Sequence, residues 1–284
     1  MILDGKKVSN LIINQVKEQM RDIEDDVTLA IVSVGKNPAS EIYIRNKMKM
    51  CQIVGINCIH YHNNNNHVVE DSIVDLIVDL NRDPRITGIL VQLPLPEHIN
   101  EKRVIETISP LKDVDGFSNH NIGRLWAGDS CIYPCTPDGI ITLLEHYGIN
   151  VSGKHCVIIG RSNIVGKPLA AMMLQKNATV TVCHSKTKNL EEITRQADIL
   201  ISAAGAPKFI TADMIKEDAV VVDVGINYDE DGHMCGDVDF DTVCDKASYI
   251  SPVPGGVGPM TVAKLMQRVL ITKKLQEGKV DIDV

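Results

Sequence analysis

Residues 156–168 read CVIIGRSNIVGKP, and this stretch decides the fold. Val157–Ile159 predict a buried strand, Gly160 permits a tight turn, and a helix is expected to begin at Gly166. A helix N-terminus after such a turn offers unpaired N–H groups and a positive dipole end to a phosphate. Ser162 replaces the middle glycine of the usual G-x-G-x-x-G pattern, so the motif taken alone leaves a purely structural turn open.

The sequence around this motif alternates between strand and helix patterns, as in a doubly wound nucleotide-binding domain. The expected elements are helix 137–147, strand 156–160, helix 166–176, strand 179–183, helix 190–197, strand 199–203 and strand 219–224. The segment 258–275 predicts a long amphipathic helix after a Gly/Pro-rich loop.

The first part of the chain has the same alternation, which predicts a second parallel sheet covered by helices on both faces. Its expected elements are a helix with apolar residues from Val8 to Ile23, strand 29–34, a helix from Pro38 to Val54, strand 56–60, helix 68–80, strand 86–93 and helix 101–108. The tract 62–67 is expected to be a solvated loop, with metal binding by its histidines as the less favoured alternative.

Periodicity fades between Ser109 and Pro137, where Pro, Gly, Asp and Asn gather. The inter-domain region is placed here, which gives an α/β protein of two αβ domains with a cleft between them. The N-terminal domain, with a parallel sheet, is expected over residues 1–118. The C-terminal domain, of the Rossmann type, is expected over residues 119–269. We expect the end of the last helix, about 270–284, to pack back on the N-terminal domain.

Composition excludes several classes of protein. The 284 residues are 44% hydrophobic and 23% charged, which is typical of a globular protein rather than a disordered one. The formal net charge of −8 gives no overall positive field for nucleic acid or anionic lipid. Neither a signal peptide nor a membrane span is visible, so the expected location is cytoplasmic.

The eight cysteines form no C-x-x-C pair, and disulfides are not expected in a cytosolic setting. Cys131 and Cys135 could be imagined as metal ligands. No second pair or histidine cluster completes a site, so no metal is expected.

The strand expected over 179–183 ends at Cys183-His184-Ser185, where an NAD enzyme ordinarily places an acidic residue for the ribose 2′-hydroxyl. No carboxylate is present at this position. The hydroxyl of Ser185 and the guanidinium of Arg161 could instead bind a 2′-phosphate, so the expected cofactor is NADP. Lys167 and Lys186 are alternative sources of that positive charge. For His184, packing or exposure is favoured over general acid catalysis.

Candidate chemistry lies in the first domain. Ser40, Tyr43 and Lys47 share one helix face at spacings i, i+3 and i+7. Gln92 lies at the carboxyl end of a buried strand, where ligands bind in open α/β sheets. Asp115, in the segment Lys112–Gly116, adds a carboxylate to the inter-domain region, while Asp113 fits an ordinary acidic turn as well.

The chain resembles the bifunctional methylenetetrahydrofolate dehydrogenase/cyclohydrolases, the FolD family. The resemblance rests on these residues and on several longer motifs, which follow in the same order along nearly the whole chain. The matching motifs are Val34-Gly35-x-x-Pro38-Ala39-Ser40-x-x-Tyr43-x-x-x-Lys47-x-Lys49-x-Cys51, Gly88–Pro96, Lys112–Gly116, Pro134–Pro137, Gly160–Pro168, Cys183–Ser185, Asp223–Asn227, Gly236–Val238 and Pro252–Thr261.

The resemblance implies NADP-dependent oxidation of 5,10-methylene-tetrahydrofolate, then hydrolysis of the 5,10-methenyl product to 10-formyl-tetrahydrofolate, in a homodimer with the folate in the cleft. Lys47 would be the principal catalytic group, Tyr43 would lie along the aminobenzoyl ring, Gln92 would hydrogen-bond Lys47, and Asp115 would hold the pterin amino edge. The residues implied to contact NADP are Gly160, Arg161, Ser162, Ser185 and Ile226. The loop containing Pro254, Gly255 and Gly256 would close beside both ligands.

Two other interpretations are open from the sequence. Another NADP-linked α/β reductase, such as a shikimate-dehydrogenase-like protein, would not explain Tyr43, Lys47, Gln92 and Asp115 together. A non-catalytic NADP-sensing module would need only the second half of the chain.

Overall fold

The computed structural model describes residues 1–65 and 68–279. The chain folds into two compact units. The N-unit comprises Leu11–Tyr133 and the chain from Val262 onward, and the C-unit comprises Met1–Asn10 and Pro134–Thr261. Two of the three boundaries fall inside helices, α1 (Gly5–Arg21) and α10 (Val257–Gln276), and the third lies between Tyr133 and Pro134, just before a helix begins at Cys135. The sequence places the domain boundaries at 118/119 and near 270.

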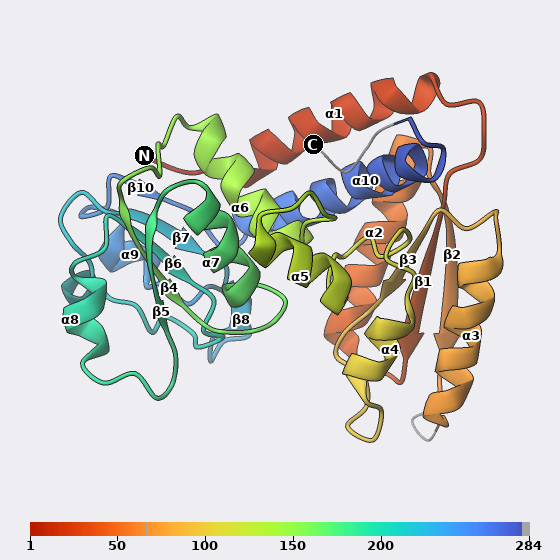
Figure 1. The fold of residues 1–284 in the computed structure, drawn as a ribbon. Helices are drawn as coiled ribbons and strands as arrows, with labels where there is room; N and C mark the ends of the chain where they lie inside the picture. The colour runs from red at the N-terminus through yellow and green to blue at the C-terminus, as the bar shows by residue number, and fades with distance from the viewer. Residues whose placement is uncertain (66–67, 280–284) are drawn as a thin grey trace. The chain divides into compact units, whose positions relative to one another are not determined.

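The N-unit is built on a three-stranded parallel sheet in the order β2-β1-β3 (Figure 1). The strands are β1 (Thr28–Val34), β2 (Asn57–Asn63) and β3 (Gly88–Val91). The helices that accompany them are α2 (Pro38–Val54), α3 (Glu70–Arg82), α4 (Glu101–Thr107) and α5 (Asn119–Ala127), together with the N-unit parts of α1 and α10. Every residue of β1 is buried, as expected for a central strand with helices on both faces.

Side-chain alternation divides this sheet into two different faces. Ala30, Val32, Ile89 and Val91 belong to a core shared with apolar residues of α3 and α4. The opposite face carries Leu29, Ile31 and Ser33 of β1, and their β2 partners in register are Cys58, His60 and His62. Figure 1 shows α2 and α3 on opposite sides of the sheet.

The second half of α10 lies against N-unit segments. The Nε2 atom of Gln276 donates to the carbonyls of Thr87 and Leu111 at 2.8 and 2.9 Å, and Lys273 forms an ion pair with Asp25 at 3.1 Å. These contacts begin well before residue 270, because the sulfur of Met266 lies 3.7 Å from that of Cys51.

The C-unit has a five-stranded parallel sheet in the order β10-β7-β6-β4-β5. Its strands are β4 (His155–Ile159), β5 (Thr179–Cys183), β6 (Ile199–Ser202), β7 (Val220–Asp223) and β10 (Tyr249–Ile250). The helices are α6 (Cys135–His146), α7 (Gly166–Gln175), α8 (Leu190–Thr194), the 3-10 helix Ala212–Met214 and α9 (Phe240–Val243), and β8 (Asn227–Tyr228) and β9 (Met234–Cys235) form an antiparallel hairpin. Because β5 and β6 flank β4, the carboxyl end of β4 is a topological switch point, where ligands bind in such sheets.

The structure corrects the sequence-based prediction in several places, and the two described next lie between Asn57 and Pro137. The segment 109–137 contains α5, whose first turn is capped by the Ser118 hydroxyl and whose end is Gly128 at φ +82°. Nine residues are too few for a clear helical period, which explains why the pattern missed it. His62 lies in β2 rather than in a loop, while residues 66 and 67 of the predicted loop lie outside the described part.

Among the described residues, none of the helices is long and apolar enough to cross a membrane. All eight cysteines, including Cys131 and Cys135, have free thiols.

Candidate functional site

Helix α2 carries the first group of candidate residues. The Asn37 side chain accepts a hydrogen bond from the Ser40 amide at 3.1 Å, which caps the helix, and Pro38 begins it. Tyr43 and Lys47 are both half-buried and lie on the face that carries Ser40. The Ser40 hydroxyl donates to the Leu93 carbonyl at 3.5 Å, which connects this face to the segment after β3.

Gln92 fixes the side chain of Lys47. The Lys47 ammonium nitrogen donates to Gln92 Oε1 at 3.0 Å, and Gln92 Nε2 donates to the Leu93 carbonyl at 2.8 Å. The backbone N–H of Gln92 also donates to the Val32 carbonyl at 2.8 Å, which continues the hydrogen bonding between β3 and β1. Both ends of the glutamine side chain and its backbone are therefore held, and its amide oxygen is aimed at Lys47.

The segment after α4 is organised by two buried charges. The Lys112 ammonium donates to the carbonyls of Leu80 and Asp83 at 3.0 and 2.7 Å, and so binds the carboxyl end of α3. Desolvation lowers the pKa of Lys112. Asp113, only 1% exposed, accepts hydrogen bonds from the amides of residues 116, 117 and 118 at 2.9, 3.3 and 2.9 Å and from Asn121 Nδ2 at 3.0 Å. Asp113 is thus the hub of the turn that carries Asp115.

Asp115 has an unusual electrostatic environment. Desolvation raises the pKa of its carboxyl to about 6, Lys47 opposes this shift, and the charge of Asp113 adds to it. The influence of Lys47 shows that the two predicted site residues lie within electrostatic reach of each other. A titratable group perturbed by burial and by a specific charged neighbour is typical of a functional site.

The turn after β4 leaves no room for side chains at its two glycines. Gly160 has φ +120°, and a Cβ there would lie 2.3 Å from the Ala203 carbonyl oxygen. A Cβ at Gly166 would lie 2.1 Å from the Gly160 carbonyl oxygen. The close approach of strand, turn and helix that a dinucleotide pyrophosphate needs is therefore present.

Ser162 contributes a function that glycine would not have. Its hydroxyl accepts hydrogen bonds from the amides of Val165 and Gly166 at 3.1 and 3.5 Å, and its carbonyl accepts from the Lys167 amide at 3.1 Å. The serine therefore organises the entry into α7 and explains how the motif keeps its shape without the middle glycine.

The residues predicted to select the cofactor lie beyond the ends of neighbouring strands. Ile159 is the register partner of Cys183, so Arg161 and Ser185 each follow a strand end by two residues, and both are exposed. His184 instead accepts a hydrogen bond from the Lys186 amide at 3.1 Å, so its ring stabilises the turn. The Lys167 ammonium donates to Asn163 at 2.7 Å, and Lys186, the other alternative cation, is exposed beside Ser185.

Two aspartates that the site prediction did not single out organise the carboxyl ends of β6 and β7. Asp223 accepts from the amides of Gly225, Asp237 and Val238 at 2.9, 3.0 and 2.9 Å. Burial and the nearby Asp237 raise the pKa of Asp223 to about 6, with burial as the larger cause. The sequence signal for this pair is that both aspartates lie inside motifs that carry the family resemblance, Asp223–Asn227 and Gly236–Val238.

Asp237 extends this network to the segment next to Ile226. Its carboxylate accepts from the Ser202 hydroxyl at 2.9 Å, the Ala204 amide at 2.7 Å and Asn227 Nδ2 at 2.9 Å. Ile226 itself is 43% exposed. An apolar side chain held outward at the end of a parallel sheet is suited to contact a flat ring.

The loop after β10 is held against the beginning of α1 within the C-unit. The Lys6 amide donates to the Gly255 carbonyl at 3.0 Å, and Gly256 donates to the Pro252 carbonyl at 2.8 Å. A Cβ at Gly5 would overlap the Gly256 carbonyl, so the close approach requires glycine there. Pro254 is exposed at the tip of this loop.

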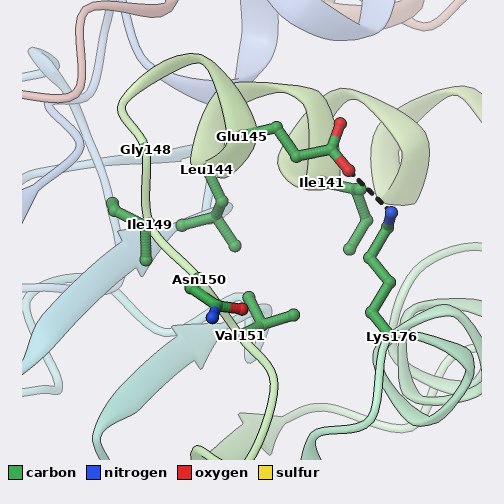
Figure 2. Close-up of a pocket in the computed structure, with 8 residues that line it drawn as sticks. All are labelled: Ile141, Leu144, Glu145, Gly148, Ile149, Asn150, Val151 and Lys176. Carbon is green, nitrogen blue, oxygen red and sulfur yellow. Dashed lines mark hydrogen bonds and ion pairs between the residues drawn. The ribbon is translucent and has the colours of Figure 1, made fainter.

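A shallow pocket of about 400 Å³ in the C-unit contains none of the predicted site residues (Figure 2). It is lined by residues of α6, the following turn and the end of α7, and Lys176 binds Glu145 across it at 2.6 Å. The charged groups of this pocket are paired with each other, and it offers no nucleophile. It is therefore separate from the candidate chemistry.

Comparisons with known proteins agree with this arrangement. Residues 3–115 match the catalytic domain of tetrahydrofolate dehydrogenase/cyclohydrolase, and residues 134–277 match the NAD(P)-binding domain of the same enzymes. The bifunctional protein FolD of Lachnoclostridium phytofermentans is 50% identical over 97% of this chain and 99% of its own.

Solved structures agree as well. The FolD methylenetetrahydrofolate dehydrogenase/cyclohydrolase of Campylobacter jejuni has 48% identity and a TM-score of 0.95, covering 97% of this chain and 99% of its own. The Trypanosoma brucei enzyme, solved with NADP cofactor and an inhibitor, has 34% identity and a TM-score of 0.93, covering 98% of both chains.

Proposed function

The chain belongs to the tetrahydrofolate dehydrogenase/cyclohydrolase family, a bifunctional group of one-carbon enzymes, and we propose how its residues divide the two reactions. The substrate is 5,10-methylene-tetrahydrofolate, which is oxidised to the 5,10-methenyl cation and then hydrolysed to 10-formyl-tetrahydrofolate. The observation that carries the assignment is the hydrogen bond from Lys47 to Gln92, because it fixes an amine within electrostatic reach of Asp115, the carboxylate proposed to bind the pterin.

Lys47 is the principal catalytic residue of the hydrolytic step. Water adds to the methenyl carbon of the cation, and the amine takes the proton that this water loses. Cleavage of the bond between that carbon and N5 then requires a proton on N5, which the same ammonium group returns. The hydroxyl proton of the adduct leaves as the formyl C=O bond forms, so one proton is released overall. Gln92 holds the Lys47 nitrogen in a single orientation for both transfers.

Tyr43 and Asp115 orient the folate. The Tyr43 ring lies along the aminobenzoyl group, and the Asp115 carboxylate accepts hydrogen bonds from the amino edge of the pterin. A carboxylate is suited to that edge because it accepts from several N–H groups at once. Its partial burial strengthens those bonds.

NADP fits the C-unit and, when bound, accepts the hydride in the oxidative step. Gly160 and Ser162 would hold the pyrophosphate at the turn into α7, and Ile226 would contact the nicotinamide end. Arg161 and Ser185 would bind the 2′-phosphate, since no acidic residue stands at Ser185 to favour a free ribose hydroxyl. The matched family domain takes NAD or NADP, so preference for NADP is part of the proposal.

The loop containing Pro254, Gly255 and Gly256 would contribute backbone groups to ligand binding. Its anchoring to the beginning of α1 supports a fixed position for those groups. We also propose that the protein is a homodimer, as the family resemblance implies.

A spectrophotometric assay of the purified protein with 5,10-methylene-tetrahydrofolate and either NADP or NAD tests this function. NADPH and methenyl-folate absorbance are followed separately. We expect NADPH to form with little methenyl-folate accumulating. Accumulation would remove Lys47 from the hydrolytic step, and no reduction with either cofactor would overturn the proposal.

A further inference from the structure

The Asp237 carboxylate is completely buried in the C-unit, and hydrogen-bond donors occupy both of its oxygens. Oδ2 accepts from the Ser202 hydroxyl at 2.9 Å and from the Ala204 amide at 2.7 Å. Oδ1 accepts from the Ala206 amide at 3.0 Å and from Asn227 Nδ2 at 2.9 Å. Because an ionised carboxylate only accepts hydrogen bonds, it matches a site that is built from four donors.

Two of these donors belong to the loop that follows β6. This loop borders the turn proposed to hold the pyrophosphate, because the Ala203 amide donates to the Ile159 carbonyl at 2.7 Å and a Cβ at Gly160 would lie 2.3 Å from the Ala203 carbonyl oxygen. Ala204 is exposed, so the loop presents backbone groups at the carboxyl ends of β4 and β6. The shape of this part of the ligand-binding edge therefore depends on the amides that Asp237 holds.

The fourth donor belongs to the segment after β7. Asn227 directly follows Ile226, the apolar residue proposed to contact the nicotinamide end of the cofactor. A Cβ at Gly225 would lie 2.2 Å from Asp237 Oδ1, so this segment packs directly on the carboxylate. The Asp237 amide in turn donates to Asp223 Oδ1 at 3.0 Å, which fixes Asp237 to the end of β7.

We propose that Asp237 is a positioning residue for the dinucleotide. It holds the loop after β6 and the segment with Ile226 in one arrangement, and so sets how tightly and in what alignment the cofactor binds. Asp237 is buried and therefore acts through these two segments, whose backbone is already ordered when the cofactor arrives. This inference rests on the proposed function, in which the C-unit binds NADP.

The Asp237→Asn variant removes the charge and changes the size of the side chain very little. Its NH2 group would replace one of the two oxygens and would face the N–H of Ala204 or Ala206, so one loop amide would lose its acceptor. We expect the dissociation constant for NADP to rise by about tenfold or more, because the loop would have to become ordered on binding.

Calorimetry with NADP on the full-length enzyme measures this change, and hydrolysis of methenyl-tetrahydrofolate without cofactor is measured in parallel. The hydrolysis should keep its wild-type rate, because its proposed residues lie in the N-unit. Asp113→Asn is the matched control, since it changes an equally buried carboxylate of the N-unit and should leave NADP affinity unchanged. An unchanged dissociation constant in Asp237→Asn would overturn the proposal, and so would an equal loss of hydrolysis, which would indicate a merely structural role.

A second variant keeps the proposal testable if Asp237→Asn fails to fold. Asn227→Ala removes only the bond from the carboxylate to the segment with Ile226. We expect kcat of the dehydrogenase to fall by about tenfold, with a smaller change in KM for NADP, because the nicotinamide end would lose its alignment. Ser202→Ala removes a bond to the same carboxylate without freeing either segment, and should retain the wild-type kcat.

A wild-type kcat in Asn227→Ala would overturn the alignment of the nicotinamide end by Asp237. If the wild-type enzyme itself bound no NADP, the proposed function would fall and this inference with it. The wild-type measurement therefore distinguishes failure of the proposed function from failure of the inference.

Discussion

Lys47 on α2 donates a hydrogen bond of 3.0 Å to Gln92, the residue that follows β3. The pairing depends on strand alternation. Because side chains alternate along a strand, Gln92 points to the same face of the sheet as Leu90. Val91, between them, points into the core that the sheet shares with α3 and α4. A shift of one residue at the end of β3 would send the amide to the other face of the sheet.

Replacing Lys47 with Met should abolish the cyclohydrolase and leave NADP binding intact. Loss of a general acid–base group typically costs about 10²–10⁴-fold in rate, and methionine keeps much of the side-chain length. Hydrolysis of methenyl-tetrahydrofolate by absorbance and NADP binding by calorimetry are the two measurements. An equal loss of cofactor affinity would contradict the assignment.

Replacing Gln92 with Met should lower kcat by about tenfold or more with a smaller change in KM, because the amine of Lys47 would lose its fixed acceptor. The pH profile of kcat should also move, which a purely structural role would not require. The Gln92→Glu variant keeps an oxygen acceptor and serves as the control. An unchanged pH profile in Gln92→Met would show that the amide does not act through Lys47.

The raised pKa of Asp115, about 6, predicts a pH dependence of folate binding. Below that pH the free enzyme carries a protonated carboxyl at this position, so kcat/KM for methylene-tetrahydrofolate should fall as the pH is lowered. The Asp115→Asn variant should have a much lower kcat/KM and lack this acidic limb. An Asn variant with the wild-type profile would mean that another group controls the acidic limb.

The same carboxyl also affects the free energy of unfolding. The pKa of Asp115 is about 6 in the folded protein, against an ordinary value of 3.8. Between these two pH values, the folded protein keeps a proton on Asp115 that the unfolded chain has released. Its contribution to stability is therefore lost as the pH rises through that window. The pKa of Asp223 is raised in the same way, and its effect is present in both proteins compared. The free energy of unfolding in urea is measured at pH 4 and pH 7 for wild type and Asp115→Asn, and the difference between the two proteins isolates the effect of Asp115.

Replacing Arg161 with Ala should lower kcat/KM for NADP by roughly 10- to 100-fold and leave that for NAD nearly unchanged, since only the 2′-phosphate would lose its charge-assisted bonds. Parallel kinetics with both cofactors measure this. Lys186→Ala is the matched control, because it removes an exposed cation beside Ser185. A similar selectivity loss in that control would transfer the role from Arg161 to the neighbouring lysine.

Replacing Asp113 with Ala should destabilise the folded protein by about 2–4 kcal/mol, because several buried donors would lose their acceptor. Asp113→Asn should cost less, since one oxygen acceptor remains. Urea unfolding measures both. Wild-type stability in the Ala variant would show that the turn is held by other contacts.

Much of the fold could be predicted from the sequence because its local signals agree with one another. The apolar runs of β1 and β4, the Asn37-Pro38 helix start and the glycine turn at 160 each specify a local conformation. Short elements such as α5 and the β8–β9 hairpin were missed because their sequences are too brief to show a period. The roles of Lys47 and Gln92 came from the family resemblance, and the structure supplies the hydrogen bond between them.

The sequence by itself determined the class of fold, the glycine-rich turn and the family, because these depend on patterns that are close together along the chain. Only the tertiary structure decided that Asp113 is a buried hub and that Asp237 connects the end of β6 with the segment beside Ile226. These contacts join residues on different elements, and helix docking and strand register set which side chains share a face. A one-dimensional pattern fixes neither, because both follow from how the whole apolar core packs.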